Sequence, residues 1–359
     1  MPTLFDPVQL GAVAAPNRVL MAPLTRARGT RDHVATPLMA DYYAQRASAG
    51  LIISEGIGIS RQGLGWPFAT GLWTDAQVAG WKQVTDAVHE AGGRIFAQLW
   101  HMGRLVHSSV IGEQPVAPSP IVAPGHAHTY DGNKPYETPR ALELEEIPAL
   151  IESYRVAARN AIAAGFDGVQ IHAANGYLID EFLRDGVNQR TDAYGGSPEN
   201  RTRLLREVTQ AVAEVVGADR TAVRLSLNGP TQGVDDSNAA AIAEAAARAL
   251  EPIGLAFLEL RELKPFGTRG ATDVPRQSPL VRQHFSGPLV LNSDYDAASA
   301  QADLDSGLAQ AISFGRPFLA NPDLPERLRT GAPLNPPREE TFYTQSGEGY
   351  TDYPALEAA

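Results

Sequence analysis

The chain has 359 residues, no cysteine and a formal net charge of -11. The lack of cysteine excludes disulfides, iron–sulfur clusters, cysteine nucleophiles and thiolate zinc sites. The acidic balance, without a basic cluster, argues against nucleic acid or an anionic membrane as a partner. The chain has no run of about 18 apolar residues, so we expect no membrane span. Because the first residues, MPTLFDPVQLG, lack the basic and apolar regions of a secretion signal, we expect a cytoplasmic protein.

Eight short runs rich in Val, Ile and Leu recur along the chain and predict buried strands. They are NRVLMAP (17–23), LIISEG (51–56), RIFAQLW (94–100), GVQIH (168–172), AVRLS (222–226), FLEL (257–260), PLVLN (288–292) and AISFG (311–315). Helix-like segments separate most of them, for example residues 75–92, 145–165 and 238–254. Eight such units favour a single closed (β/α)8 TIM barrel over an open dinucleotide-binding sheet, and no GxGxxG follows the first run. We expect one domain over residues 1–359.

Two stretches depart from this repeat. Residues 103–140 are rich in Pro, Gly and His and cannot form one helix, because each Pro interrupts it. We expect a long loop over the barrel mouth here, after the third strand, where functional loops accumulate. The Pro-rich tail from about Asn321 contains TFYTQSGEGYTDYP, whose aromatic residues predict that the tail packs back onto the domain.

Polar side chains concentrate where the predicted strands end, which is the active-site face of such barrels. A Gln or an Arg inside an apolar strand is costly unless it is hydrogen-bonded, so a bound ligand is one possible partner. A polar layer bonded within the barrel is the alternative partner. The residues concerned are Thr25 after the first strand, Gln98 and Trp100 in the third, His172, Asn175 and Tyr177 at the end of the fourth, and Arg224 in the fifth.

The stretch HAANGY, residues 172–177, has two interpretations. In the first, His172 and Asn175 donate hydrogen bonds to one oxygen of a bound molecule, and the Tyr177 phenol donates a proton. In the second, His172 bonds a backbone carbonyl, Asn175 and Gly176 form a left-handed turn, and Tyr177 begins the next helix. We expect no metal, because no carboxylate or second histidine completes a ligand set here.

The segment SFGRPFLANPDL (313–324) follows the eighth predicted strand. Loops after strands seven and eight of such barrels often bind phosphate through backbone N–H groups. Gly315 permits close approach of a ligand, and Arg316 adds a fork of donors. The alternative is a strand-terminal Gly followed by a surface Arg.

Several longer segments together resemble the old yellow enzyme family of FMN-dependent ene-reductases, over nearly the whole chain. They are NRVLMAPLTRAR, AQLWHMGR, PVAPS, TPRALELEEIP, GYLIDEFL, NQRTDAYGGSPENR, ANPDL and EGYTDYP. The resemblance is closest to the bacterial branch that includes pentaerythritol tetranitrate, N-ethylmaleimide and glycerol trinitrate reductases. It implies FMN as cofactor, NADPH or NADH as reductant and small electron-poor alkenes as substrates; we expect a monomer or homodimer.

The resemblance also implies a role for each polar residue. Flavin contacts are implied for Pro23, Leu24, Thr25, Gly56, Gln98, His172 and Arg224, and phosphate contacts for Asn292, Ser293, Asp294, Gly315 and Arg316. Walls of the substrate pocket are implied for Trp66, Trp100 and Tyr343. His172 and Asn175 are implied to bind the carbonyl or nitro oxygen of the substrate. Hydride then passes to the β-carbon while Tyr177 protonates the α-carbon.

Two residues depart from the family pattern, and a third bears on the branch. Asn175 stands where close bacterial relatives often have a second His, which we expect to alter substrate preference. Asp294 lies close to the expected phosphate, where the family often has a Gly/Ala-rich loop. Thr25, in a chain without cysteine, argues against the thermophilic-like branch, which tends to have Cys there.

Two other functions fit a barrel without a flavin. A flavin-free aldolase or isomerase could bind a sugar phosphate at Gly315 and Arg316. Its weakness is the lack of a convincing catalytic Lys, since Lys264 follows the sixth strand in a Pro-containing loop. A ligand-binding barrel without turnover is the other alternative.

Overall fold

A closed barrel of eight parallel strands forms the centre of the computed structural model, which describes residues 1–268 and 270–356. Each strand overlaps one of the eight predicted runs, so the predicted (β/α)8 barrel is confirmed. Around the barrel the strands are β3 (Val19–Met21), β4 (Ile52–Gly58), β5 (Ile95–Trp100), β10 (Gly168–Ala173), β11 (Thr221–Leu225), β12 (Phe257–Arg261), β13 (Leu289–Asn292) and β14 (Ala311–Phe314).

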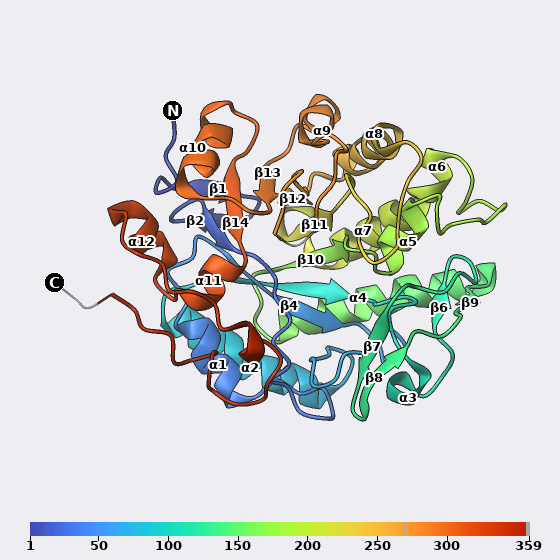
Figure 1. The fold of residues 1–359 in the computed structure, drawn as a ribbon, viewed down its shortest axis with the longest axis horizontal. Coiled ribbons are helices and arrows are strands. Elements are labelled where there is room, and N and C mark those ends of the chain that lie inside the picture. Colours follow the sequence, from blue (N-terminus) through green and yellow to red (C-terminus); the bar gives the residue numbers. More distant parts are fainter. Residues whose placement is uncertain (269, 357–359) are drawn as a thin grey trace.

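Helices follow the strands and surround the barrel (Figure 1). The helices predicted within residues 75–92, 145–165 and 238–254 are present, and the first begins with a capping box between Thr74 and Gln77. The longer helices are α1 (Pro37–Ala44), α2 (Asp75–Glu90), α4 (Ile147–Ala163), α7 (Arg203–Val216), α8 (Ala239–Leu250), α9 (Ser278–His284), α10 (Ala297–Asp305) and α12 (Leu324–Thr330). The shorter ones are α3 (Ser108–Ile111), α5 (Leu178–Leu183), α6 (Pro198–Arg201), α11 (Arg316–Ala320) and 3-10 turns at Leu144–Glu146, Ala218–Arg220, Glu251–Ile253 and Glu339–Thr341.

Side chains alternate between the inside and the outside of the barrel along each strand. In β12, Leu258 and Leu260 belong to the large outer core shared with the helices, whereas Phe257 belongs to a separate inner cluster. That inner cluster is apolar and fills the N-terminal half of the barrel with Leu20, Leu51, Ile53, Phe96, Ala222, Phe257, Val290 and Ala311. On five strands the next inward position is polar, namely Gln98, Arg224, Glu259, Asn292 and Ser313.

An antiparallel hairpin of β1 (Val8–Leu10) and β2 (Val13–Ala15) closes the N-terminal end of the barrel. Leu10 and Val13 pack into the inner apolar cluster. Gly11, at the turn, has a φ of 58°, and a Cβ there would lie 2.0 Å from the carbonyl oxygen of Asp219. Any side chain at this turn would therefore clash with the barrel. The sequence interpretation missed this hairpin.

Residues 103–140 contain short elements rather than one helix. They are α3, the parallel pair β6 (Val116–Ala117) and β9 (Arg140–Ala141), and the hairpin β7 (His126–Thr129) and β8 (Gly132–Pro135). His128 of the hairpin lies 4.3 Å from the ring of Trp66 and 6.0 Å from that of Tyr343, between ring centroids. This long connection, residues 103–140, therefore reaches the wall of the cavity described below. In the described part of the chain, no helix is long and apolar enough to cross a membrane.

Candidate active site

A cavity of about 1080 Å³ opens at the carboxyl ends of the barrel strands. This is the face where barrel enzymes carry their active sites. Twelve residues singled out from the sequence line it: Pro23, Leu24, Thr25, Asn175, Tyr177, Arg224, Asn292, Ser293, Asp294, Gly315, Arg316 and Tyr343. Five others do not line it: Gly56, Trp66, Gln98, Trp100 and His172. Trp66 packs on the lining residue Tyr343, and Trp100 and His172 pack on Tyr177. Gly56 lies against Trp100, and Gln98 bonds to Gln170, which is not a lining residue either.

The floor of the cavity is a polar layer that spans the barrel interior. Gln98 Nε2 donates to Gln170 Oε1 at 2.8 Å, and Gln170 Nε2 donates to Glu259 Oε2 at 2.6 Å. The other carboxylate oxygen of Glu259 accepts from Ser313 Oγ at 2.6 Å and lies 3.6 Å from Arg224 Nε. Gln98 thus has a partner within the barrel, as the alternative interpretation of the sequence proposed. Gln170, Glu259 and Ser313 were not singled out from the sequence.

Arg224 belongs both to this layer and to the cavity lining. Its Nη2 donates to Asn292 Oδ1 at 2.8 Å, and Asn292 Nδ2 donates to the carbonyl oxygen of Ser313 at 2.9 Å. The Nε of Arg224 is buried and has no hydrogen-bond partner. It faces Glu259 Oε1 at 3.6 Å, so the buried carboxylate offsets the buried positive charge without a hydrogen bond at this nitrogen.

His172, Asn175 and Tyr177 come together at the end of β10. The Tyr177 ring packs edge-on against His172 and Trp100, with centroid separations of 5.0 and 4.9 Å. Asn175 and Gly176 have φ values of 61° and 80°, so the left-handed turn of the second interpretation is present. Tyr177 is the residue before α5. The His172 Nδ1 is buried without a hydrogen-bond partner, so no backbone carbonyl satisfies it.

Burial and nearby cations determine the charge states of these groups. Burial, followed by the charges of Arg224 and Arg261, holds the pKa of His172 well below its ordinary value, so the imidazole is neutral at neutral pH. Burial raises the pKa of the Tyr177 phenol well above its ordinary value, so the phenol keeps its proton. The site therefore presents a neutral imidazole and a protonated phenol.

Arg261 is a cavity residue that the sequence interpretation missed. It ends β12, lines the cavity and donates from Nη1 to Asn175 Oδ1 at 3.1 Å. Burial, with the charge of Arg224, lowers the pKa of Arg261 to about 10, which still leaves it charged at neutral pH. The predicted sixth strand ended one residue too early, at Leu260. Arg261 would otherwise have met the same criterion as Arg224.

The loop after β13 lies beside Gly315 and Arg316, at the other end of the cavity. A Cβ added at Gly315 would have only Leu24 Cδ2 near it, at 3.6 Å, so this backbone faces open space. Arg316 pairs with Asp294 at 3.3 Å. Burial raises the pKa of Asp294, but hydrogen bonds from Thr268 and the charge of Arg316 outweigh it and keep that pKa below its ordinary value. The carboxylate therefore faces Arg316 and Thr268 as a paired charge.

Aromatic rings form one wall of the site. Trp66 lies 5.0 Å from Tyr343, between ring centroids, and Tyr343 stands half exposed at the rim. Gly56 leaves room for the Trp100 ring, because a Cβ at Gly56 would lie 2.6 Å from that ring. Lys264 does not line the cavity: its Nζ donates to the Asp294 carbonyl oxygen at 2.8 Å and lies 4.6 Å from the Tyr295 ring centroid.

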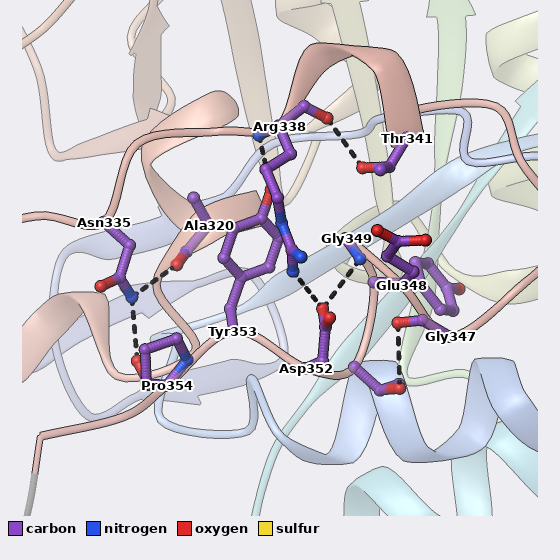
Figure 2. Close-up of polar contacts among 12 residues, drawn as sticks. Ala320, Asn335, Arg338, Thr341, Gly347, Glu348, Gly349, Asp352, Tyr353 and Pro354 are labelled. Atoms are coloured by element: carbon purple, nitrogen blue, oxygen red, sulfur yellow. Dashed lines mark hydrogen bonds and ion pairs between the residues drawn. The ribbon is translucent and has the colours of Figure 1, made fainter.

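The C-terminal segment, residues 335–354, folds back onto the barrel, as its aromatic residues predicted. Figure 2 shows the contacts that hold it: Asn335 Nδ2 donates to the carbonyl oxygens of Ala320 and Pro354, both at 2.9 Å. The Arg338 N–H donates to the Tyr353 hydroxyl at 2.7 Å, and the Arg338 side chain pairs with Asp352.

Two buried arginines anchor the same segment from the barrel side. Arg26 and Arg28 lie one and three residues after Thr25 and are 1% and 2% exposed. Arg28 donates to the carbonyl oxygens of Thr341 at 3.0 Å and Phe342 at 2.8 Å, and Arg26 donates to that of Gly349 at 2.7 Å. One short stretch, residues 23–28, therefore lines the cavity and also positions the segment that carries Tyr343.

Comparisons with known proteins agree with this geometry. The chain matches the model of the NADH:flavin oxidoreductase / NADH oxidase family over residues 3–335. It is 61% identical to a solved old yellow enzyme homologue from Zymomonas mobilis, with a TM-score of 0.98 and coverage of 99% of this chain and 100% of that one. For morphinone reductase, also solved with tetrahydroNAD, the identity is 50%, the TM-score 0.95 and the coverage 99% and 97%. A probable flavin mononucleotide-dependent alkene reductase of Leishmania infantum is 40% identical over 98% of this chain and 97% of its own.

The fold and the cavity define a barrel oxidoreductase with its site at the carboxyl ends of the strands. The chain belongs to the NADH:flavin oxidoreductase / NADH oxidase family, within the old yellow enzyme family of FMN-dependent ene-reductases. The family resemblance read from the sequence motifs is thereby confirmed.

Proposed function

We propose that this protein reduces the C=C bond of α,β-unsaturated carbonyl and nitro compounds, with NADPH or NADH as the reductant, and that residues 1–359 act as one FMN-binding domain. The observation that carries the proposal is the meeting of His172, Asn175 and Tyr177 beside a large cavity. Morphinone reductase, a relative, has been solved with a nicotinamide analogue, which supports a nicotinamide as reductant. The relative from Leishmania infantum is named as an alkene reductase.

The residues around the cavity fit FMN. The volume of the cavity, about 1080 Å³, suffices for a cofactor of this size. The buried His172 Nδ1 has no hydrogen-bond partner and is available to a polar ring edge. The guanidinium of Arg224 lines the cavity and offers a positive charge to such an edge. Arg316 and the open backbone of Gly315 suit a phosphate, although Arg316 must then share its charge between the phosphate and Asp294.

Under this proposal, each residue singled out from the sequence has a position toward the cofactor or the substrate. The cavity residues Pro23, Leu24, Thr25 and Arg224 would hold the ring system, together with Gly56, Gln98 and His172 behind them. The cavity residues Asn292, Ser293, Asp294, Gly315 and Arg316 would hold the phosphate. Trp66, Trp100 and Tyr343 form the substrate wall. The chemistry that FMN supplies when bound is hydride transfer from a reduced nicotinamide to an electron-poor alkene.

The protein's own residues then bind the activating group and deliver a proton. His172 and Asn175 donate hydrogen bonds to the carbonyl or nitro oxygen, where negative charge develops as the alkene is reduced. Tyr177, which remains protonated, gives its phenolic proton to the α-carbon. Trp66 and Tyr343 exclude water from one side of the substrate.

The test is the spectrum and turnover of the purified protein. We expect a yellow protein that releases FMN on denaturation, bleaches with NADPH or NADH under anaerobic conditions and regains its colour when cyclohex-2-enone is added. Comparing the bleaching rates with the two nicotinamides decides which is preferred. A colourless protein that FMN cannot reconstitute would contradict the proposal. A yellow protein that bleaches but is never reoxidised by enones or nitroalkenes would contradict the substrate class.

A further inference from the structure

The side-chain amide of Asn175 is held in one orientation. Arg261 Nη1 lies 3.1 Å from Asn175 Oδ1 and 3.3 Å from Thr231 Oγ1. A guanidinium has donors only, so its partner on the amide must be the oxygen. This removes the usual ambiguity between the oxygen and the nitrogen of an Asn side chain.

The backbone of Asn175 is fixed as well. Its N–H donates to Ser226 Oγ at 2.8 Å, and its carbonyl oxygen accepts from Gln232 Nε2 at 2.7 Å. Its φ of 61° places it in the left-handed region, which Asn tolerates better than most residues. With Oδ1 engaged by Arg261, Nδ2 is the amide group that remains, and the described residues give it no hydrogen-bond partner.

We propose that Arg261 is a positioning residue that makes Asn175 a donor toward the substrate and thereby selects the activating group. The inference rests on the proposed function and deepens it. Ketones, aldehydes and nitro groups present only acceptors and satisfy Nδ2. The N–H groups of a primary carboxamide find no acceptor on Asn175, because Arg261 has taken Oδ1, and they lose their hydrogen bonds to water on binding.

A double-mutant cycle tests this role. The variants are Arg261→Met, Asn175→Ala and the double variant, each as oxidised holoenzyme. The ligands are cyclohexyl methyl ketone and cyclohexanecarboxamide, which share a skeleton and cannot be reduced by ene-reduction. Calorimetric titration gives Kd for each. We expect Arg261→Met to raise the Kd for the ketone about tenfold, as the loss of one oriented hydrogen bond predicts. The Kd for the carboxamide should change less, so that the two Kd values come closer together.

The decisive comparison is made in the Asn175→Ala background. If Arg261 acts through Asn175, Arg261→Met has little further effect on ketone binding there. The proposal would be overturned if Arg261→Met raised the Kd for the ketone equally in both backgrounds. It would also be overturned if the ratio of the two Kd values were the same in Arg261→Met as in the wild type. Should Arg261→Met fail to fold, Arg261→Gln carries the same cycle, because Gln offers an acceptor beside its donor and cannot fix the amide.

Two controls separate positioning from charge and from general damage. Arg261→Lys keeps a donor-only cation and is expected to retain more of the ketone preference than Arg261→Met. Arg248→Met makes the same chemical change on the exposed face of α8, where Arg248 pairs with Glu244, and should leave Kd unchanged. If the wild-type protein neither binds FMN nor reduces any enone, the proposed function fails. If it does both and the cycle is additive, only the role of Arg261 fails.

Discussion

At the scale of single residues, Tyr177 is the group whose chemistry can be tested most directly. Burial keeps its phenol protonated, and Tyr177→Phe removes the proton while keeping the ring contacts with His172 and Trp100. We expect turnover of cyclohex-2-enone to fall roughly 100-fold, a typical loss for a general acid. Nitroalkene turnover should fall less, because a nitronate is a stable anion that water can protonate after release.

Rapid-mixing measurements of the two half-reactions check this prediction. The rate of nicotinamide oxidation should be unchanged, because that half-reaction needs no phenolic proton. The matched control is Tyr130→Phe, in the connection of residues 103–140. The Tyr130 hydroxyl is buried without a hydrogen-bond partner, so this variant should behave as the wild type. Full enone turnover by Tyr177→Phe would mean that another group donates the proton.

The residue scale also shows what could be predicted from the sequence. Polar residues inside apolar runs are visible because each costs free energy in a strand buried on both faces, and this criterion found Gln98 and Arg224. Gln170, Glu259 and Ser313 also lie inside predicted runs and meet the same criterion, but the sequence interpretation overlooked them. That Gln170 and Glu259 join Gln98 to Arg224 could not be predicted, because only barrel closure brings these strands together. Closure is a long-range property that local patterns do not contain.

At the scale of elements, the C-terminal segment is predicted to act as a positioned wall. Arg28→Met removes donors to the carbonyl oxygens of Thr341 and Phe342, at about 1 kcal/mol for each hydrogen bond. We therefore expect the segment to loosen and KM for enones to rise several-fold, with kcat changed less. Trypsin should then cleave after Arg338, which is held in the wild type by Tyr353 and Asp352.

The control for this element is Arg329→Met, on the exposed face of α12, where Arg329 pairs with Glu326. It removes an Arg close in sequence without touching the segment and should leave KM and proteolysis unchanged. FMN content should be the same in all three proteins. A rise in KM without new cleavage after Arg338 would show that Arg28 acts on the cavity by another route.

Elements differed in how well the sequence predicted them. The barrel strands were found because a strand buried on both faces is a continuous apolar run. The hairpins were missed: β1 and β2 have three residues each, too few for a period to show. The β7–β8 hairpin had a signal, the dipeptide Asp131–Gly132 at the end of its turn, but the surrounding Pro residues suggested only a loop.

At the scale of the whole molecule, buried acids and bases should make stability depend on pH in two directions. Glu55, in β4, is fully buried, and burial raises its pKa from 4.5 to about 7. Burial lowers the pKa of His101 from 6.5 to about 3. The unfolded chain gains a proton on His101 as the pH falls below 6.5, so stability is lost in that direction. The Glu55 carboxyl has the opposite effect: it lowers the free energy of unfolding as the pH rises.

The sign for Glu55 follows from which state holds the proton. Between pH 4.5 and 7 the unfolded chain has released the Glu55 proton while the folded protein still keeps it. The free energy of unfolding therefore falls as the pH rises, by about 1.4 kcal/mol per pH unit for a single group. Above pH 7 both states are ionised, and the loss stays constant. Tyr43, Arg26 and Arg28 beside the carboxyl reduce the shift but do not cancel it.

Glu55→Gln isolates this contribution, because Gln keeps an acceptor for the Tyr43 hydroxyl, now 3.2 Å from Glu55 Oε2, and cannot ionise. We expect the variant to be more stable than the wild type at pH 8, by up to roughly 3 kcal/mol, and the advantage to vanish near pH 4.5. Urea unfolding followed by circular dichroism at several pH values measures the difference, in which His101 and all other groups cancel. The exposed Glu145→Gln should follow the wild type throughout. A constant difference between Glu55→Gln and the wild type would mean that Glu55 is ionised in the folded protein across this range, held by Arg26 and Arg28.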